Sequence, residues 1–400
     1  MSGILEGVKV VDMGQVAAIP VAGSILADWG AEVIKIEPLT GEMYRGLRRS
    51  QGVETGVFNV RIELYNRNKR SMAIDLKKEA GREIFYKLIK QSDVFMSNYR
   101  LNALERLKVD YASLSQVNPK IVYATITGYG TKGPERDDPG YDLTAGWART
   151  GIMHLLGEPG RPPPMVRTGM IDRMAAGYCV AGICAALLHR DKTGEGQELD
   201  LSLFHTGIWD INADIQSAVI GTPFQRHDRN KAGNPLQNTY RTKDDRWFQL
   251  AMPQSQPLWP GFCRALERPD LEKDPRFNTM EQRTENCVEL IRILDSVLAT
   301  KTIDEWEGRF RENKLVFGRV QTPEEVTADP QAIAAGIFAD YDHPAIGRTK
   351  LVASPVMFTQ NPASVRTAAA EIGQHDEEIL LELGYGWDDI GKFKEQMVIL

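Results

Sequence analysis

Short runs of apolar and β-branched residues alternate with stretches of helical periodicity along the first 130 residues. Within residues 79–90, for example, Ile84, Phe85, Leu88 and Ile89 fall on one face of a helix. The elements expected here are strands at 8–13, 31–37, 93–98 and 120–128 and helices at 20–29, 79–90 and 103–107. This alternation is typical of βαβ units and predicts a Rossmann-like parallel sheet with helices on both faces.

The pattern then changes to one long, nearly wholly apolar stretch at residues 170–190, rich in alanine and glycine. Small side chains let a helix pack closely against its neighbours, so we expect this helix to be buried. The later elements expected are a strand at 197–204, a hairpin within 239–252, and helices at 257–267, 281–299 and 376–384. After about residue 220, a hairpin followed by helices therefore replaces the alternation of single strands and helices.

A chain of 400 residues exceeds what one hydrophobic core usually organises, so we expect two domains. The fold class predicted is α/β, with a Rossmann-like large domain and a smaller α+β domain. The expected division is 1–205 for the first part of the large domain, 206–224 for a linker, 225–330 for the small domain, and 331–400 for a return linker and the last part of the large domain.

Composition narrows the class of protein. A net charge of −6 and a pI near 5.7 argue against a general nucleic-acid or anionic-membrane binder. We find no signal segment and no apolar run near the roughly 20 residues of a membrane helix. The four cysteines lack CxxC spacing, which favours reduced thiols and a cytoplasmic protein.

Positive charge gathers near the N-terminus, where residues 1–110 hold 17 Lys and Arg against 14 Asp and Glu. Either a polyanionic ligand or an ordinary solvated surface would account for this excess. Several cationic clusters follow predicted strands, at the sheet edge where ligands bind in doubly wound folds. The clusters are Arg45 to Arg49, Asn66 to Arg70, Lys77 with Lys78, and Arg100 with Arg106.

The sequence has no HExxH, P-loop, GxSxG or strand-linked GxGxxG motif, and its six histidines are isolated. Local sequence therefore gives no support for a metal site or a dinucleotide cofactor. Asp172 is the notable residue, because it begins the apolar helix. It is either a structural first-turn acid or a nucleophilic carboxylate that the helix N-terminus keeps ionised.

Together, these segments resemble the class III CoA-transferase family, of the carnitine and formate CoA-transferase type, whose relatives include α-methylacyl-CoA racemases. The resemblance covers nearly the whole chain. Its most specific block is MIDRMAAGYCVAGICAALLHRDKTGEGQELDLSLF at 170–204. Further matching segments are AGSILADWGAEVIKIEP, NRNKRSMAIDLK, DVFMSNYRLNALERL, NPKIVYATITGYGTKGP, PGYDLTAGWARTG, DPRFNT, ADPQ and IGQHDEEILLELGY.

The resemblance implies a nucleophile at Asp172, which would carry an aspartyl mixed anhydride and then an aspartyl-CoA thioester. Asp142 and Tyr141 would support it. Coenzyme A and acyl-CoA would be substrates, with no permanently bound cofactor, and the second substrate would be a free carboxylic acid, an aryl or branched 2-hydroxy acid. The CoA-binding positions implied are Gln15, Ile74, Lys77, Asn98, Tyr99 and Arg106.

The resemblance also implies an interlocked homodimer. Two positions depart from the pattern of some members: Ala17 replaces a glutamine, and MPQSQPLW at 252–259 lacks the glycines of a loop that closes over the intermediate.

Two other functions stay open. A racemase of this family uses a histidine between a glycine and an acid, where this chain has Gly140-Tyr141-Asp142, and tyrosine is a poor base at neutral pH. Such an enzyme would need no second acid. A non-catalytic acyl-CoA-binding protein is the other alternative, and it would keep its activity after Asp172→Ala.

Overall fold

The computed structural model describes residues 3–46, 49–50, 53–54, 59–222 and 226–400. By its contacts the chain divides into two compact units. The large domain comprises Met1–Ile152, Met165–Thr222 and Gln331–Leu400, and the small domain comprises Met153–Pro164 and Pro223–Pro330. Residues 206–222, expected as linker, are largely helical and belong to the large domain.

The large domain is built on a six-stranded sheet whose strands are all parallel. Its strand order is β5-β2-β1-β6-β7-β8, so the order reverses between β1 and β6. This is the doubly wound arrangement, which confirms the predicted Rossmann-like class. The strands are β1 (Lys9–Met13), β2 (Glu32–Glu37), β5 (Lys69–Ala73), β6 (Val94–Ser97), β7 (Val122–Thr127) and β8 (Gln197–Ser202).

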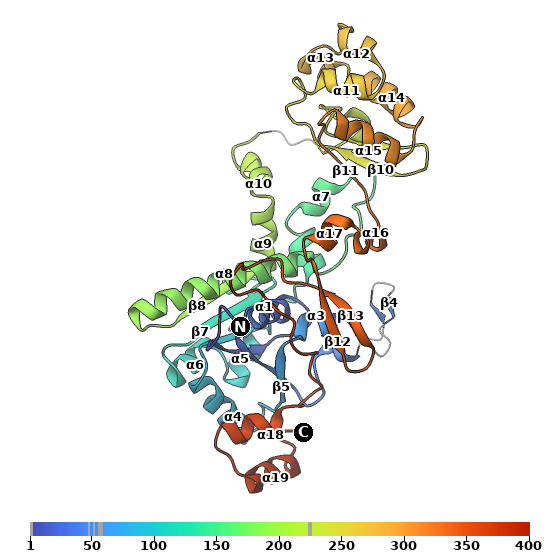
Figure 1. Cartoon of the computed structure of the whole chain (residues 1–400). Helices are drawn as coiled ribbons and strands as arrows, with labels where there is room; N and C mark the ends of the chain where they lie inside the picture. Colours follow the sequence, from blue (N-terminus) through green and yellow to red (C-terminus); the bar gives the residue numbers. More distant parts are fainter. Residues whose placement is uncertain (1–2, 47–48, 51–52, 55–58, 223–225) are drawn as a thin grey trace. The chain divides into compact units, whose positions relative to one another are not determined.

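Helices cover both faces of the sheet, because strand side chains alternate between the two faces and those on both faces are buried. On one face, Val11, Ile34 and Phe95 join a core with residues of α4, α6 and α18. Figure 1 shows α18 and α19 beside α4, where the chain ends. On the other face α1 packs against α8 and α3. The helices are α1 (Ala18–Asp28), α3 (Val60–Asn66), α4 (Glu79–Lys90), α5 (Leu101–Leu107), α6 (Tyr111–Val117), α8 (Met170–Thr193), α18 (Asp376–Glu382) and α19 (Trp387–Glu395).

Shorter elements complete the large domain and its connections. No bounds were predicted for these elements from the sequence, and β5 was not predicted at all, because its charged residues hide its strand pattern. They are α2 (Met43–Gly46), β3 (Arg49–Ser50), β4 (Val53–Glu54), the π-helix η1 (Asp142–Ala148), α7 (Ile152–Leu156), α9 (Leu203–Asp210), α10 (Asn212–Val219), α17 (Pro330–Ala334), β12 (Phe338–His343) and β13 (Gly347–Val352).

Helix α8 differs from the sequence expectation, because only one of its faces is buried within the domain. Ala175, Cys179 and Ile183 are buried, whereas Tyr178 and Leu188 are 43 % and 64 % exposed. The helix is also long and apolar enough to cross a membrane by length and composition alone, contrary to the reading of the sequence. Half of that stretch is buried inside the domain. Some of the small residues, such as Ala175, therefore pack against α1 and the sheet, whereas others, such as Ala181, lie on an exposed apolar strip.

The small domain holds a three-stranded antiparallel sheet and short helices around a core of aromatic residues. The hairpin expected within 239–252 is confirmed as β9 and β10. The helix expected at 281–299 is two helices, α13 and α14, which meet at Asn286. The elements are η2 (Arg229–Lys231), β9 (Thr239–Arg241), β10 (Trp247–Leu250), α11 (Trp259–Ala265), α12 (Pro269–Lys273), α13 (Met280–Glu285), α14 (Cys287–Leu298), α15 (Ile303–Glu312), β11 (Phe317–Arg319) and α16 (Pro323–Thr327).

Candidate active site

Two cavities open at the carboxyl ends of the central strands of the large domain, where the strand order reverses. The larger, of about 450 Å³, lies among the loop after β1, the start of α5, the end of β7 and the segment before η1. The smaller, of about 390 Å³, lies between the loops after β2 and β5. Tyr99 lines both, so the two cavities are neighbours. Ligands bind at this place in doubly wound folds.

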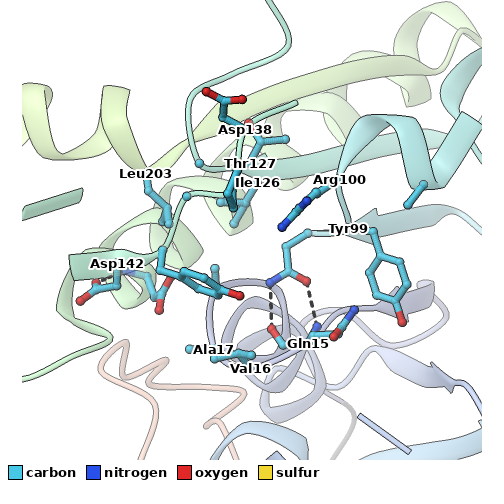
Figure 2. Close-up of a pocket in the computed structure, with 18 of the residues that line it drawn as sticks. Gln15, Val16, Ala17, Tyr99, Arg100, Ile126, Thr127, Asp138, Asp142 and Leu203 are labelled. Atoms are coloured by element: carbon cyan, nitrogen blue, oxygen red, sulfur yellow. Dashed lines mark hydrogen bonds between the residues drawn. The ribbon is translucent and has the colours of Figure 1, made fainter. Parts of the chain in front are cut away.

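The structure brings the residues singled out from the sequence to these cavities. Ile74 and Lys77 line the smaller cavity with Tyr99. The others line the larger cavity: Gln15, Asn98, Tyr99, Arg106, Tyr141, Asp142 and Asp172. Figure 2 shows Gln15, Val16 and Ala17 on the side of the larger cavity opposite Ile126 and Thr127. Segments that are far apart in the sequence therefore share one site.

Asp172 lies in the first turn of α8, after Gly169 at the N-cap position. Gly169 has φ +86°, and a Cβ there would lie 3.0 Å from the guanidinium of Arg173. Burial, and after it the Asp142 carboxylate, raise the pKa of Asp172 to about 7, although Arg173 opposes the rise. Desolvation and a second carboxylate therefore oppose the predicted effect of the helix N-terminus, which favours the ionised form of Asp172.

Asp142, and not Asp172, accepts the N–H groups at the start of α8. Its carboxylate is buried and accepts the N–H groups of Gly169 (2.8 Å) and Asp172 (3.1 Å) and the indole N–H of Trp147 (3.1 Å). Asp142 and Trp147 are five residues apart in the π-helix η1, a spacing that stacks them on one face. Within the described part of the chain, no hydrogen bond engages the carboxylate of Asp172. It faces the cavity as an available group.

The loop after β1 is held to the loop after β6 by a pair of hydrogen bonds. The side-chain amide of Asn98 accepts the N–H of Gln15 and donates to its carbonyl, each at 2.8 Å (Figure 2). Val16 has φ +65°, which a β-branched residue rarely adopts. Ala17, the position that departs from the family pattern, follows this turn and lines the cavity. The loop therefore has one enforced shape beside Asp172.

Residues that sequence reasoning missed stand on the other side of Asp172. Arg173 donates to the hydroxyl of Tyr65 at 3.1 Å. Burial raises the pKa of Tyr44, and Asp172 is among the acidic groups close enough to add to that rise. Trp147 lies within the matching segment PGYDLTAGWARTG, whereas Tyr44 and Tyr65 lie in no segment singled out from the sequence. Only tertiary structure brings the two tyrosines near Arg173 and Asp172.

Two of the four predicted cationic clusters contain residues that form ion pairs within the protein. Arg45 pairs with Glu37, Arg67 with Asp28, Lys69 with Asp12, and Arg70 with three glutamates including Glu378. The side chain of Arg49 and all of Arg48 lie outside the described residues. Lys77, Arg100 and Arg106 differ, because they line the cavities and the described residues offer them no ion pair.

Segment 252–259, which occupies the place of the glycine-rich closing loop of some family members, belongs to the small domain, where Ser255 is buried against Arg283. A search of the described residues finds no group of three or more His, Cys, Asp or Glu side chains that could hold a metal ion.

Comparison with known proteins agrees with the geometry. Residues 5–376 match the family model of CoA-transferase family III. The chain is 36 % identical to (R)-2-hydroxy-4-methylpentanoate CoA-transferase of Clostridioides difficile, over 99 % of both chains. It is 34 % identical to cinnamoyl-CoA:phenyllactate CoA-transferase of Clostridium sporogenes, over 100 % of this chain and 98 % of the other.

Among solved structures, a CaiB/BaiF family protein from Brucella suis superposes with a TM-score of 0.84 at 28 % identity, covering 96 % of this chain and all of the other. The doubly wound sheet, the position of Asp172 and the family match over most of the chain agree with one another. The chain belongs to CoA-transferase family III.

Proposed function

We propose that this class III CoA-transferase moves CoA from an acyl-CoA thioester to a free carboxylic acid through covalent intermediates on Asp172. One observation carries the proposal. The carboxylate of Asp172 lines the cavity at the strand-order reversal, and Asp142, instead of Asp172, accepts the N–H groups at the start of α8. A carboxylate that neither caps its helix nor forms an ion pair is available to attack a carbonyl carbon.

The steps balance without metal or ATP. An oxygen of Asp172 attacks the thioester carbonyl, the C–S bond breaks, and a mixed anhydride and CoA thiolate form. The thiolate then attacks the aspartyl carbonyl, which releases the donor acid and leaves an aspartyl-CoA thioester. The acceptor carboxylate attacks this thioester, which expels the CoA thiolate and forms a new anhydride. The thiolate then attacks the acceptor's acyl carbonyl, which forms the new acyl-CoA and frees the Asp172 carboxylate. Each step exchanges one acyl bond for another, so covalent storage and positioning suffice.

The two neighbouring cavities support binding of CoA at the large domain. Lys77 on the smaller cavity and Arg100 and Arg106 on the larger one are cations suited to phosphate oxygens. Tyr99 stands between the cavities, and burial raises its pKa to about 12, so it presents a neutral phenol. We infer that the nucleotide end of CoA lies toward Lys77 and the thioester lies toward Asp172.

We propose a branched or aryl 2-hydroxy acid as the acceptor. The relatives named for 2-hydroxy-4-methylpentanoate and for phenyllactate support this class. The test is a panel of free acids in which these two compete with oxalate and succinate for one acyl-CoA donor. A higher kcat/KM for the dicarboxylic acids would contradict the class, and turnover without any added acid would favour racemase chemistry.

We also propose that the chain works as an interlocked homodimer in the cytoplasm. The exposed apolar strip on α8 continues in exposed residues of α9 and α10, among them Trp209 and Val219. A second copy of the chain is the partner we infer for this surface, because patches of this kind mark protein interfaces. Four free cysteines are consistent with a reducing compartment.

The decisive experiment traps the intermediate on Asp172. The enzyme is mixed with acyl-CoA, quenched with hydroxylamine, and digested for mass spectrometry, and we expect a hydroxamate on Asp172. Asp172→Asn should carry no label and should lose at least about a thousandfold in kcat. An unlabelled wild-type chain that turns over normally would refute the proposal. A binding protein without catalysis would keep its ligand affinity in Asp172→Asn and never be labelled.

A further inference from the structure

A layer of buried charges lies directly beneath the loop that lines the cavity. Asp12 on β1, Lys35 on β2, Lys69 on β5 and Glu42 before α2 are each less than 5 % exposed. Asp12 and Lys35 lie in the carboxyl-terminal halves of β1 and β2, and Glu42 follows β2, whereas Lys69 is the first residue of β5 and reaches Asp12 through its long side chain. None of the four lines the larger cavity, so the substrates would not touch them.

These side chains hold the main chain from Gly14 to Val16. Asp12 accepts the N–H of Gly14 at 2.8 Å, and Lys35 donates to the carbonyl of Gly14 at 3.0 Å. Glu42 accepts the N–H of Val16 at 2.8 Å. With the Asn98 amide on Gln15, the loop is held by side chains at three successive residues, including the strained Val16.

The loop in turn requires glycine at its first position. A Cβ on Gly14 would lie 2.5 Å from Ile19 and 2.7 Å from the Asp12 carboxylate. Lys69 fixes the other oxygen of Asp12 at 2.7 Å and also donates to the carbonyl of Pro20 in the first turn of α1. The charge layer therefore sets both the turn after β1 and the start of the helix that follows it.

Such a layer is a poor way to gain stability. Removing each ion from water costs on the order of several kcal/mol, and apolar replacements of buried ion pairs are often neutral or stabilising. The Lys35–Glu42 pair is also imperfect, because Nζ of Lys35 and Oε1 of Glu42 are 4.0 Å apart. This Oε1 is buried and has no hydrogen-bond partner among the described residues. A conformational role explains why these charges stand beneath this loop.

We propose that Glu42 and Lys35 are positioning residues, which hold the Gly14–Val16 main chain in the shape that acyl transfer at Asp172 requires. The inference rests on the proposed function, because the loop matters through the cavity that it shares with Asp172. We therefore expect substitutions of these two residues, which do not line the cavities, to lower kcat more than they weaken the binding of acyl-CoA.

The test compares Glu42→Gln with Glu42→Met. Both remove the charge and have similar length, but only glutamine keeps an oxygen that can accept the N–H of Val16. We expect Glu42→Met to lose more than tenfold in kcat with a KM for acyl-CoA within about twofold of wild type, and Glu42→Gln to recover most of the loss. Equal kcat values for the two variants would overturn the inference.

A matched control separates positioning from mere stability. Asp28 is equally buried in the same domain and pairs with Arg67 at 2.7 Å, at the far end of α1 from the cavity. Asp28→Leu should lower the unfolding temperature at least as much as Glu42→Met and leave kcat per folded molecule unchanged. If it lowers kcat equally, the role of Glu42 is structural and the inference is wrong.

Hydroxylamine trapping distinguishes a failure of the nucleophile at Asp172 from a failure of the positioning role of Glu42. A labelled wild-type chain with slow labelling of Glu42→Met supports both proposals. A labelled wild type with equally fast labelling of Glu42→Met overturns the positioning role alone. An unlabelled wild type overturns the nucleophile, and the positioning role with it.

Discussion

At the scale of single residues, the site contains two carboxylates, Asp142 and Asp172, in different environments. Asp142 is buried and accepts three hydrogen bonds, so it is fixed and occupied. Asp172 is a nearby carboxylate without a hydrogen bond in the described chain, and its pKa is raised to about 7. Groups whose environments differ this much are assigned different roles in catalysis. We assign Asp142 to positioning and Asp172 to attack.

The rate should therefore depend on the ionisation of Asp172. Only the carboxylate attacks, so kcat/KM should fall as pH drops below about 7. Arg173 lowers this pKa, so Arg173→Met should raise it and move the acidic limb of the profile to higher pH. Arg173→Lys keeps the charge and serves as control. A profile in Arg173→Met that coincides with wild type would contradict the assignment.

Removal of the Asp142 charge should lower the pKa of Asp172, whereas removal of the Arg173 charge should raise it. Asp142 raises the pKa of Asp172, so Asp142→Asn should move the acidic limb of kcat/KM to lower pH. The amide also loses acceptor capacity for the N–H groups of Gly169 and Asp172, which should lower the free energy of unfolding by about 1–3 kcal/mol. The pH–rate profile and urea unfolding measure the two effects separately.

At the scale of elements, the start of α8 depends on the shape of one glycine. Gly169 combines a positive φ with close packing against Arg173. Gly169→Ala should lower the free energy of unfolding by about 1 kcal/mol or more, because alanine is strained at positive φ. It should also shift the acidic limb, since Arg173 must move. As a comparison, Gly177→Ala in the same helix meets nothing within 4 Å and should be neutral or stabilising. Equal losses in both variants would refute this account.

The sheet shows which parts of the element pattern the sequence contains. Strands β1, β2, β6 and β7 were predicted within about two residues, because buried parallel strands are apolar runs. β5 was not, since Lys69, Arg70 and Ser71 carry polar groups whose carboxylate partners lie in other, distant parts of the chain. A local pattern contains no information about partners 50 or 300 residues away.

At the scale of the whole molecule, the apolar strip on α8 should be covered in solution. We expect sedimentation to give twice the 44.8 kDa mass of the chain. Leu188→Glu places a charge on the exposed strip and should lower that mass or the yield of folded protein. Lys192→Glu, at the end of the same helix, is the control, and it should leave the mass unchanged. A wild-type mass of one chain would contradict the homodimer.

The sequence by itself determined the doubly wound class and the first-turn position of Asp172, because apolar periodicity is a local property. The family resemblance, carried by ordered motifs, identified several of the residues that line the two cavities. Tertiary structure alone decided that Asp142 takes the N–H groups at the start of α8 and that Arg45, Arg67 and Lys69 neutralise buried carboxylates. It also placed Glu42 and Lys35 beneath Val16 and Gly14. Burial, pKa and hydrogen-bond partnership depend on which distant segments meet, and no window of sequence contains that information.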